Sequence, residues 1–221
     1  MNKTLLSQAL SPNADRYDIF SPTWIIYDKV NVEAGYVNDP RDSGGETNHG
    51  ITFATSREWK SLWAKYNWNG DMRTLPEELA VEMYVKGWWE KMHLDVIHEF
   101  SPLIADKLFD FGINAGRGRA MLALQRWLTI NNLNGKKYED LTTDGLYGPA
   151  TARALKAYID WRGELGIKNL LASILCSQGE HYQGLAERRQ KDEAFIYGWF
   201  THRITADMQE YYSLIDSGKW F

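Results

Sequence analysis

Residues that could carry out acid catalysis gather in one short segment of the chain. Glu33 is followed by Asp42 and Thr47 in a stretch rich in Asp, Gly, Asn and Thr. Cleavage of a glycosidic bond requires a carboxylic acid that stays protonated near neutral pH, and usually a second carboxylate that positions water or stabilises the developing cation. We therefore interpret Glu33 as the acid and Asp42 as its partner, with the Thr47 hydroxyl orienting the attacking water.

The expected position of Glu33 suits a protonated acid. Ile26, Val30 and Glu33 are spaced at i, i+4 and i+7, so they share one face of the helix predicted between Ser21-Pro22 and Gly35. Desolvation on an apolar face and the negative end of the helix dipole both disfavour a carboxylate. We therefore expect a raised pKa for Glu33.

The identity of the second carboxylate has two alternatives. Asp42 lies in a glycine-rich turn, where an aspartate commonly caps its own backbone. Asp39, directly before Pro40, is the nearest competitor, although that position is typical of a turn former. Both aspartates therefore stay open as the partner of Glu33.

Aromatic and polar side chains surround the three candidate catalytic residues. A sugar polymer requires rings for stacking together with fixed hydrogen-bonding groups. We predict that these contacts come from Tyr36, Asn38, Asn48, His49 and, on a later helix, Tyr84.

Hydrophobic periodicity and helix-start signals predict a mainly α fold. Ser-Pro pairs start helices at 21–22 and 101–102, Thr55 and Glu58 form a capping-box pair, and a turn over 144–148 leads into a helix at Pro149. The one β-like region is 36–53, where Ser43-Gly44-Gly45 is typical of a hairpin turn. Residues 1–21 have no helical periodicity and are predicted to form a leader.

Composition excludes several classes of protein. A formal charge of −4 argues against a general nucleic-acid binder, and Cys176, the single cysteine, excludes an intrachain disulfide. His93 and His98 have no third ligand nearby, so we predict no metal site. No apolar stretch is long enough to span a bilayer, and the first ten residues resemble neither a signal peptide nor an anchor.

The segments Glu33–Pro40 and Asp42–Thr52 resemble the signature of glycoside hydrolase family 108, whose catalytic glutamate matches Glu33. Ala34 is a departure, because the family commonly has glycine there. Asp144-Gly145 to Thr151, and Gly198-Trp199 with Arg203, resemble the C-terminal peptidoglycan-binding-like region of the family. The order Glu, Asp, Thr is also similar to the triad of phage-type lysozymes.

The resemblance implies an N-acetylmuramidase with a two-lobed, lysozyme-like fold and no cofactor. The expected divisions are a leader over 1–21, a catalytic region over 22–115 and a helical peptidoglycan-binding-like region over 116–221. A phage endolysin is implied, made as a monomer in the host cytoplasm and reaching the wall with the help of a holin or another membrane-permeabilising protein. The alternatives are a secretion-associated muramidase and a non-catalytic glycan-binding module. An amidase or endopeptidase would need a metal or an activated cysteine, neither of which the sequence offers.

Overall fold

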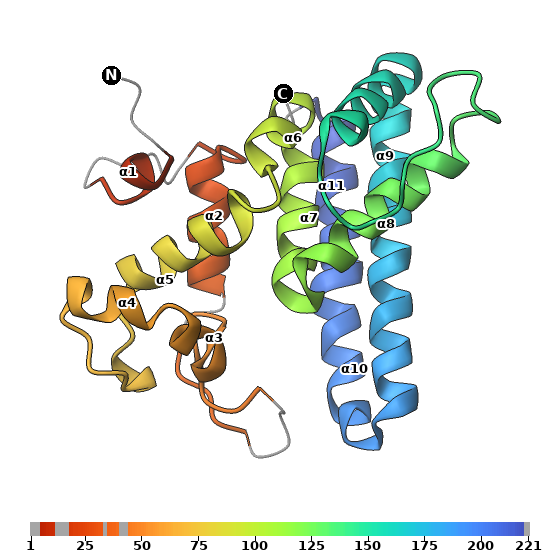
Figure 1. The fold of residues 1–221 in the computed structure, drawn as a ribbon. Helices are drawn as coiled ribbons and strands as arrows, with labels where there is room; N and C mark the ends of the chain where they lie inside the picture. Colours follow the sequence, from red (N-terminus) through yellow and green to blue (C-terminus); the bar gives the residue numbers. More distant parts are fainter. Residues whose placement is uncertain (1–4, 12–17, 33–34, 40–43, 219–221) are drawn as a thin grey trace. The chain divides into compact units, whose positions relative to one another are not determined.

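The computed structural model describes residues 5–11, 18–32, 35–39 and 44–218. The chain divides into two compact units, Met1–Glu90 and Lys91–Phe221. Helices dominate both units, as Figure 1 shows, and the described strands are confined to one small sheet in the first unit. The prediction of a mainly α fold with a small hairpin is confirmed.

The first unit is built from short helices around a two-stranded sheet. Its elements are α1 (Leu5–Ala9), α2 (Pro22–Val32), β1 (Thr47–Asn48), β2 (Ile51–Thr52), α3 (Phe53–Glu58), α4 (Lys60–Trp63), the 3₁₀ turns η1 (Ala64–Tyr66) and η2 (Met72–Thr74), α5 (Glu77–Tyr84) and the π-helical turn η3 (Val85–Trp89).

Helix α2 begins where the sequence predicts. The Ser21 hydroxyl accepts a hydrogen bond from the Trp24 amide at 3.1 Å, which satisfies one of the free N–H groups of the first turn. Ile26 and Val30 are both fully buried, so the face that the periodicity indicates is the apolar one. Tyr27 fastens α1 to this helix, because its hydroxyl donates to the Ala9 carbonyl at 2.7 Å.

The predicted hairpin is present, with its tight turn at His49-Gly50. Strands β1 and β2 are antiparallel, with Thr47 opposite Thr52. His49 (φ 49°) and Gly50 (φ 69°) both have left-handed backbone, which is the geometry of a type I′ hairpin turn. Gly44 and Gly45 lie instead in the connection between Val37 and Thr47, which form an isolated antiparallel bridge; Ser43 lies outside the described residues.

The helix after the hairpin begins three residues earlier than the predicted capping box at Thr55. Its N-cap is Thr52, whose extended backbone (φ −74°, ψ 155°) places the hydroxyl within 3.1 Å of the Thr55 amide. Thr55 is therefore inside α3, and its prediction as a cap was wrong. Trp59 (φ −104°, ψ 20°) then separates α3 from α4.

The second unit consists of long helices. They are α6 (Leu94–Phe100), α7 (Pro102–Ala115), α8 (Arg117–Ile130), α9 (Pro149–Arg188), α10 (Glu193–Phe200) and α11 (Ala206–Asp216), with the short turns η4 (Gln190–Asp192) and η5 (Thr201–Thr205). Figure 1 shows the C-terminal part of α9 running antiparallel to α10 and α11, which pack against it. The helix starts predicted at Ser101-Pro102 and Pro149 are confirmed.

Helix α9 contains a sharp break at Gly163. This residue has φ 59° and ψ −149°, a conformation that residues with a side chain rarely adopt. The segments 149–162 and 164–188 therefore run in different directions.

Buried charges join four elements of the second unit. Lys107, which is fully buried on α7, donates to Asp110 at 2.8 Å and to Asp207 at 2.5 Å. Arg203 donates to the other oxygen of Asp110 at 2.6 Å, and the Gln178 amide donates to Asp110 at 3.0 Å. These bonds connect α7 with η5, α11 and α9, and the buried Lys107 and Asp110 each have a partner of opposite sign.

Within the part of the chain that the structure describes, no helix combines the length and the apolar character that crossing a membrane requires.

Candidate active site

The predicted site residues fall into a described and an undescribed group. Glu33 and Asp42 lie outside the described residues. The other six predicted residues, Thr47, Tyr36, Asn38, Asn48, His49 and Tyr84, belong to the first unit. Five of these six lie on or beside the hairpin, and the sixth is bonded to its turn.

His49 fixes the turn of the hairpin between two helices. Its ring Nδ1 lies 3.1 Å from the Val30 carbonyl, to which it must donate because a carbonyl only accepts. Val30 is in the last turn of α2, where carbonyl groups have no partner within the helix. The Tyr84 hydroxyl of α5 donates to the backbone carbonyl of His49 at 2.7 Å. The turn is thereby held at the C-terminal end of α2.

Asn48 fixes the hairpin from a third direction. Its side chain is buried, and its Nδ2 donates to the Met72 carbonyl in η2 at 2.7 Å. Tyr84 is also fully buried, and the centroid of its ring lies 5.6 Å from the centroid of the Trp88 ring. The polar groups of Asn48, His49 and Tyr84 thus have partners inside the unit, which gives these residues a positioning role. Their contact with sugar stays a prediction.

Tyr36 and Asn38 occupy the exposed side of the hairpin region. The Tyr36 hydroxyl donates to Glu46 Oε1 at 2.7 Å, and this bond raises the pKa of Tyr36. Arg73 lies close enough to interact electrostatically with both groups, while its guanidinium binds both oxygens of Asp71 at 2.9 and 3.0 Å. This exposed surface therefore combines a ring, an amide and charges of both signs.

Sequence reasoning did not identify Glu46 or Arg73. Glu46 falls within the segment that resembles the family signature, but its sequence position indicates no role. Arg73 lies far along the chain in η2, and only the folded structure brings it near Tyr36.

Thr47 is held rigidly at the centre of the small sheet. Its backbone N–H and carbonyl both pair with Val37, at 2.9 and 2.8 Å, and its hydroxyl donates to the Gly45 carbonyl at 3.1 Å. A hydroxyl that donates its hydrogen keeps lone pairs that can accept one from water. The geometry is compatible with the predicted role in orienting a water molecule, which remains a prediction.

A buried carboxylate stabilises the helix that carries Tyr84. Glu82 is fully buried and accepts hydrogen bonds from Lys65 and Lys86, each at 2.5 Å, and from the Tyr66 hydroxyl. Burial alone would raise the pKa of Glu82, but these three donors outweigh it and lower the pKa to about 2. The cluster ties η1 and η3 to α5.

Two family models match consecutive parts of the chain. Residues 28–116 match glycosyl hydrolase 108, and residues 119–204 match a predicted peptidoglycan domain. Residues 28–116 are thus similar to the glycosyl hydrolase 108 family. The first match includes Glu33, Asp42 and every described residue of the candidate site, and the resemblance predicted from the sequence is confirmed.

A solved structure has the same fold as this chain. The structure of SagA from Brucella abortus matches with a TM-score of 0.60 and 24% sequence identity, covering 85% of this chain and 91% of that one. At this identity the likeness shows the fold alone. No curated protein matches the chain. The match to glycosyl hydrolase 108 and the match to a predicted peptidoglycan domain together support a glycosidase that acts on peptidoglycan.

Proposed function

We propose that the chain is an N-acetylmuramidase that hydrolyses the β-1,4 bond between N-acetylmuramic acid and N-acetylglucosamine, with Glu33 as the general acid. The family match over 28–116 supports the reaction class. Glu33 directly follows Val32, the last residue of α2, and the buried Ile26 and Val30 precede it at helical spacing. Poor solvation favours the protonated form of a carboxyl group, which is the form that a general acid needs.

The hydrogen bond between His49 and the Val30 carbonyl carries the proposal. It holds the hairpin turn against α2 three residues before Glu33, while Tyr84 holds the same turn against α5. An acid and the groups that complete a site must be held close to their working geometry by a rigid support. Two helices and a tight turn provide that support.

In the proposed reaction Glu33 protonates the departing glycosidic oxygen. Asp42, together with the Thr47 hydroxyl, positions water or stabilises the oxocarbenium-like transition state. Asp39 is the alternative second carboxylate. Tyr36 and Asn38 supply a ring and an amide for the sugar on the exposed side, next to Glu46 and Arg73.

We further propose the division predicted from the sequence, with a leader over 1–21, a catalytic region over 22–115 and a peptidoglycan-binding-like region over 116–221. The two family matches support the boundary between the last two, since one ends at 116 and the other begins at 119, whereas the compact units of the fold divide between Glu90 and Lys91. The proposed setting is lysis of a host cell by a phage endolysin that acts on the wall once a holin or similar protein has permeabilised the membrane. A secretion-associated muramidase is the alternative setting.

Mass spectrometry of digested peptidoglycan tests the reaction. The wild type should release fragments with N-acetylmuramic acid at the new reducing end, and in ¹⁸O-labelled water the label should enter at its C1. Glu33→Gln should lower the rate at least about a hundredfold, because it removes the proton donor. Asp42→Asn and Asp39→Asn, assayed in parallel, separate the two candidate partners.

Glu58→Gln is the matched control, since Glu58 is an exposed glutamate of α3 in the same unit. It should cleave at the wild-type rate. Cleavage by Glu33→Gln at the rate of this control would remove Glu33 from the acid role, and new amino groups in place of new reducing ends would exclude a glycosidase.

A further inference from the structure

A groove of about 500 Å³ lies on the second unit between α8 and α9. Phe111 of α7, which is buried, contributes to its lining. Trp127 of α8 lines it as well, and its indole N–H donates to the Ser177 hydroxyl of α9 at 2.8 Å. This bond fixes the orientation of the indole ring, so the groove has a rigid aromatic wall.

Three arginines line this groove. Arg119 and Arg126 come from α8, and Arg188 is the last residue of α9. Arg119 donates one hydrogen bond to the Ala115 carbonyl at 2.7 Å. The guanidinium groups of Arg126 and Arg188 are exposed and have no hydrogen-bond or ion-pair partner among the described residues. Two bidentate donors are therefore available to a ligand.

The spacing of these side chains follows from helix geometry. Arg119 and Arg126 are seven residues apart, so they lie two turns apart on one face of α8, a rise of about 10 Å. His181 and Arg188 have the same spacing on α9. The groove therefore presents donors along its length, which suits an extended ligand with several anionic groups rather than a single small anion.

Two further residues set the charge of the groove. Burial, together with Arg119, Arg188 and Arg189, lowers the pKa of His181 to about 4, so its imidazole is neutral near pH 7. Glu180 adds one exposed carboxylate. Three guanidinium groups facing a single carboxylate make a positive groove on a chain whose formal net charge is −4.

We propose that this groove binds the peptide stems of peptidoglycan, with Arg126 and Arg188 holding stem carboxylates. Stem peptides carry several free carboxylates, and their diamino acid carries an ammonium group, for which Glu180 is the complementary partner. Polyphosphate ligands match less well, because Glu180 would repel them. The groove residues on α8 and α9 lie within the segment matched by the predicted peptidoglycan domain. The inference rests on the proposed function only in taking peptidoglycan as the substrate.

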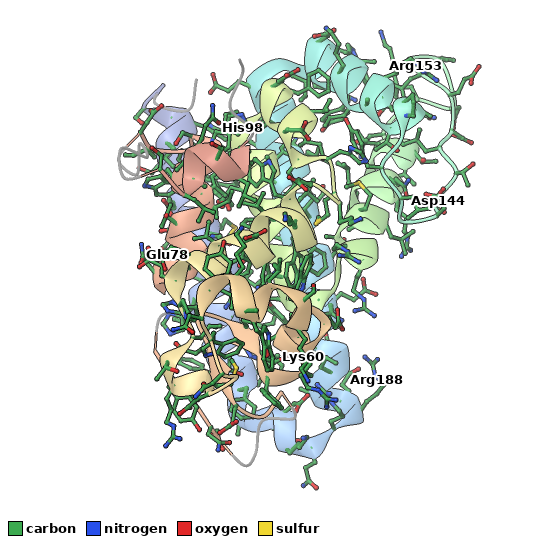
Figure 2. The ribbon with its side chains drawn as sticks, turned by 60° about the vertical axis from the view of Figure 1, so that its left-hand side comes forward. Lys60, Glu78, His98, Asp144, Arg153 and Arg188 are labelled. Carbon is green, nitrogen blue, oxygen red and sulfur yellow. The ribbon has the colours of Figure 1, made fainter. Side chains whose placement is uncertain are left out.

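Calorimetric titration of the full chain with a synthetic stem tripeptide, L-alanyl-γ-D-glutamyl-diaminopimelate, tests the proposal. Arg126→Gln and Arg188→Gln should each weaken binding by about tenfold, the loss expected for one hydrogen-bonded charge pair. A peptide with its carboxylates converted to amides should lose at least as much affinity. Arg153→Gln is the matched control, because Arg153 is exposed at the opposite end of α9 (Figure 2), and it should bind like the wild type.

Three results would overturn the proposal. The first is no binding of the tripeptide up to about 10 mM. The second is equal affinity of Arg126→Gln, Arg188→Gln and the Arg153→Gln control for the tripeptide. The third is binding of the amidated peptide, or of inorganic phosphate, that is as tight as binding of the tripeptide. The tripeptide contains no glycosidic bond, so its binding should be unchanged in Glu33→Gln. Failure of the groove and failure of the proposed hydrolysis are therefore separate outcomes.

Discussion

Replacing the buried carboxylate of Glu82 by an amide should destabilise the first unit in a pH-dependent way. In the folded chain the pKa of this group falls from 4.5 to about 2. A shift of that size corresponds to about 3 kcal/mol of stabilisation at neutral pH. Its partners Lys65 and Lys86 have side chains that are 52% and 37% exposed, so solvent screens part of the interaction. We expect Glu82→Gln to lower the free energy of unfolding by about 2 kcal/mol at pH 7.

The sign of the pH dependence follows from the direction of the shift. The unfolded chain binds the proton of Glu82 more tightly than the folded chain does, so the stabilisation is complete above about pH 4.5 and is lost as the pH falls toward 2. The difference between wild type and Glu82→Gln should therefore shrink below pH 4.5.

Urea unfolding measured by circular dichroism between pH 3 and pH 7 provides the test, with hydrogen exchange of the α5 amides to localise the effect. Glu78→Gln is the control, because Glu78 is an exposed glutamate one turn earlier on α5 (Figure 2). It should change stability by less than about 0.5 kcal/mol. Equal effects of the two substitutions, or a Glu82→Gln effect that does not depend on pH, would refute this account of the cluster.

Three other substitutions test single residues that contribute to the stability of the fold. Tyr84→Phe removes the donor to the His49 carbonyl and should cost about 1 kcal/mol in urea unfolding, with slower hydrolysis; unchanged stability with weaker substrate binding would instead indicate direct contact with sugar. Because the pKa of His181 is lowered in the folded chain, the unfolded chain binds a proton between pH 6.5 and 4 that the folded chain does not bind. Wild-type stability should therefore decrease as the pH falls from 6.5 to 4. His181→Gln should reduce this loss of unfolding free energy by about 1 kcal/mol, a value discounted for the partial exposure of the ring, in unfolding titrations at several pH values. An unchanged pH dependence of stability would contradict the prediction. Gly145→Ala would combine a positive φ (74°) with a Cβ 2.7 Å from a backbone carbonyl oxygen, and it should lower the free energy of unfolding by about 3 kcal/mol. Gly135→Ala is the control, because φ is 76° there but the space is open, and it should cost about 1 kcal/mol. Equal shifts of the melting temperature would show that the close approach at position 145 is relieved.

The helix starts were predictable because their signals are local. A serine or glycine followed by proline fixes both the cap and the first helical residue, and the structure has helices beginning at Pro22, Pro102 and Pro149. The start of α3 is different, since Thr52 and Thr55 are both acceptable caps. Thr52 becomes the cap because its pairing with Thr47 already gives it extended backbone, and that pairing is not visible in the local pattern.

The candidate site was predictable in residue type but not in orientation. Polar residues such as Asn48 and Tyr84 can face a substrate or a neighbouring backbone, and the sequence does not distinguish the two. Buried charges were missed for a related reason. Helical spacing connects Glu82 with Lys86 and Lys107 with Asp110, but Glu82 and Lys65 are 17 residues apart and Lys107 and Asp207 are 100 apart, so no periodicity indicates these distant partners.

The break at Gly163 determines how far α9 can reach. An uninterrupted helix over its 40 residues would be a straight rod of about 60 Å, well beyond the combined length of the shorter helices α10 and α11 beside it. With the break, the straight part is the segment 164–188, about 37 Å long. A single residue without a side chain thus matches the length of this helix to that of its antiparallel neighbours. A side chain at position 163 would strain this backbone conformation, which glycine adopts readily, and would therefore weaken the break that sets this length.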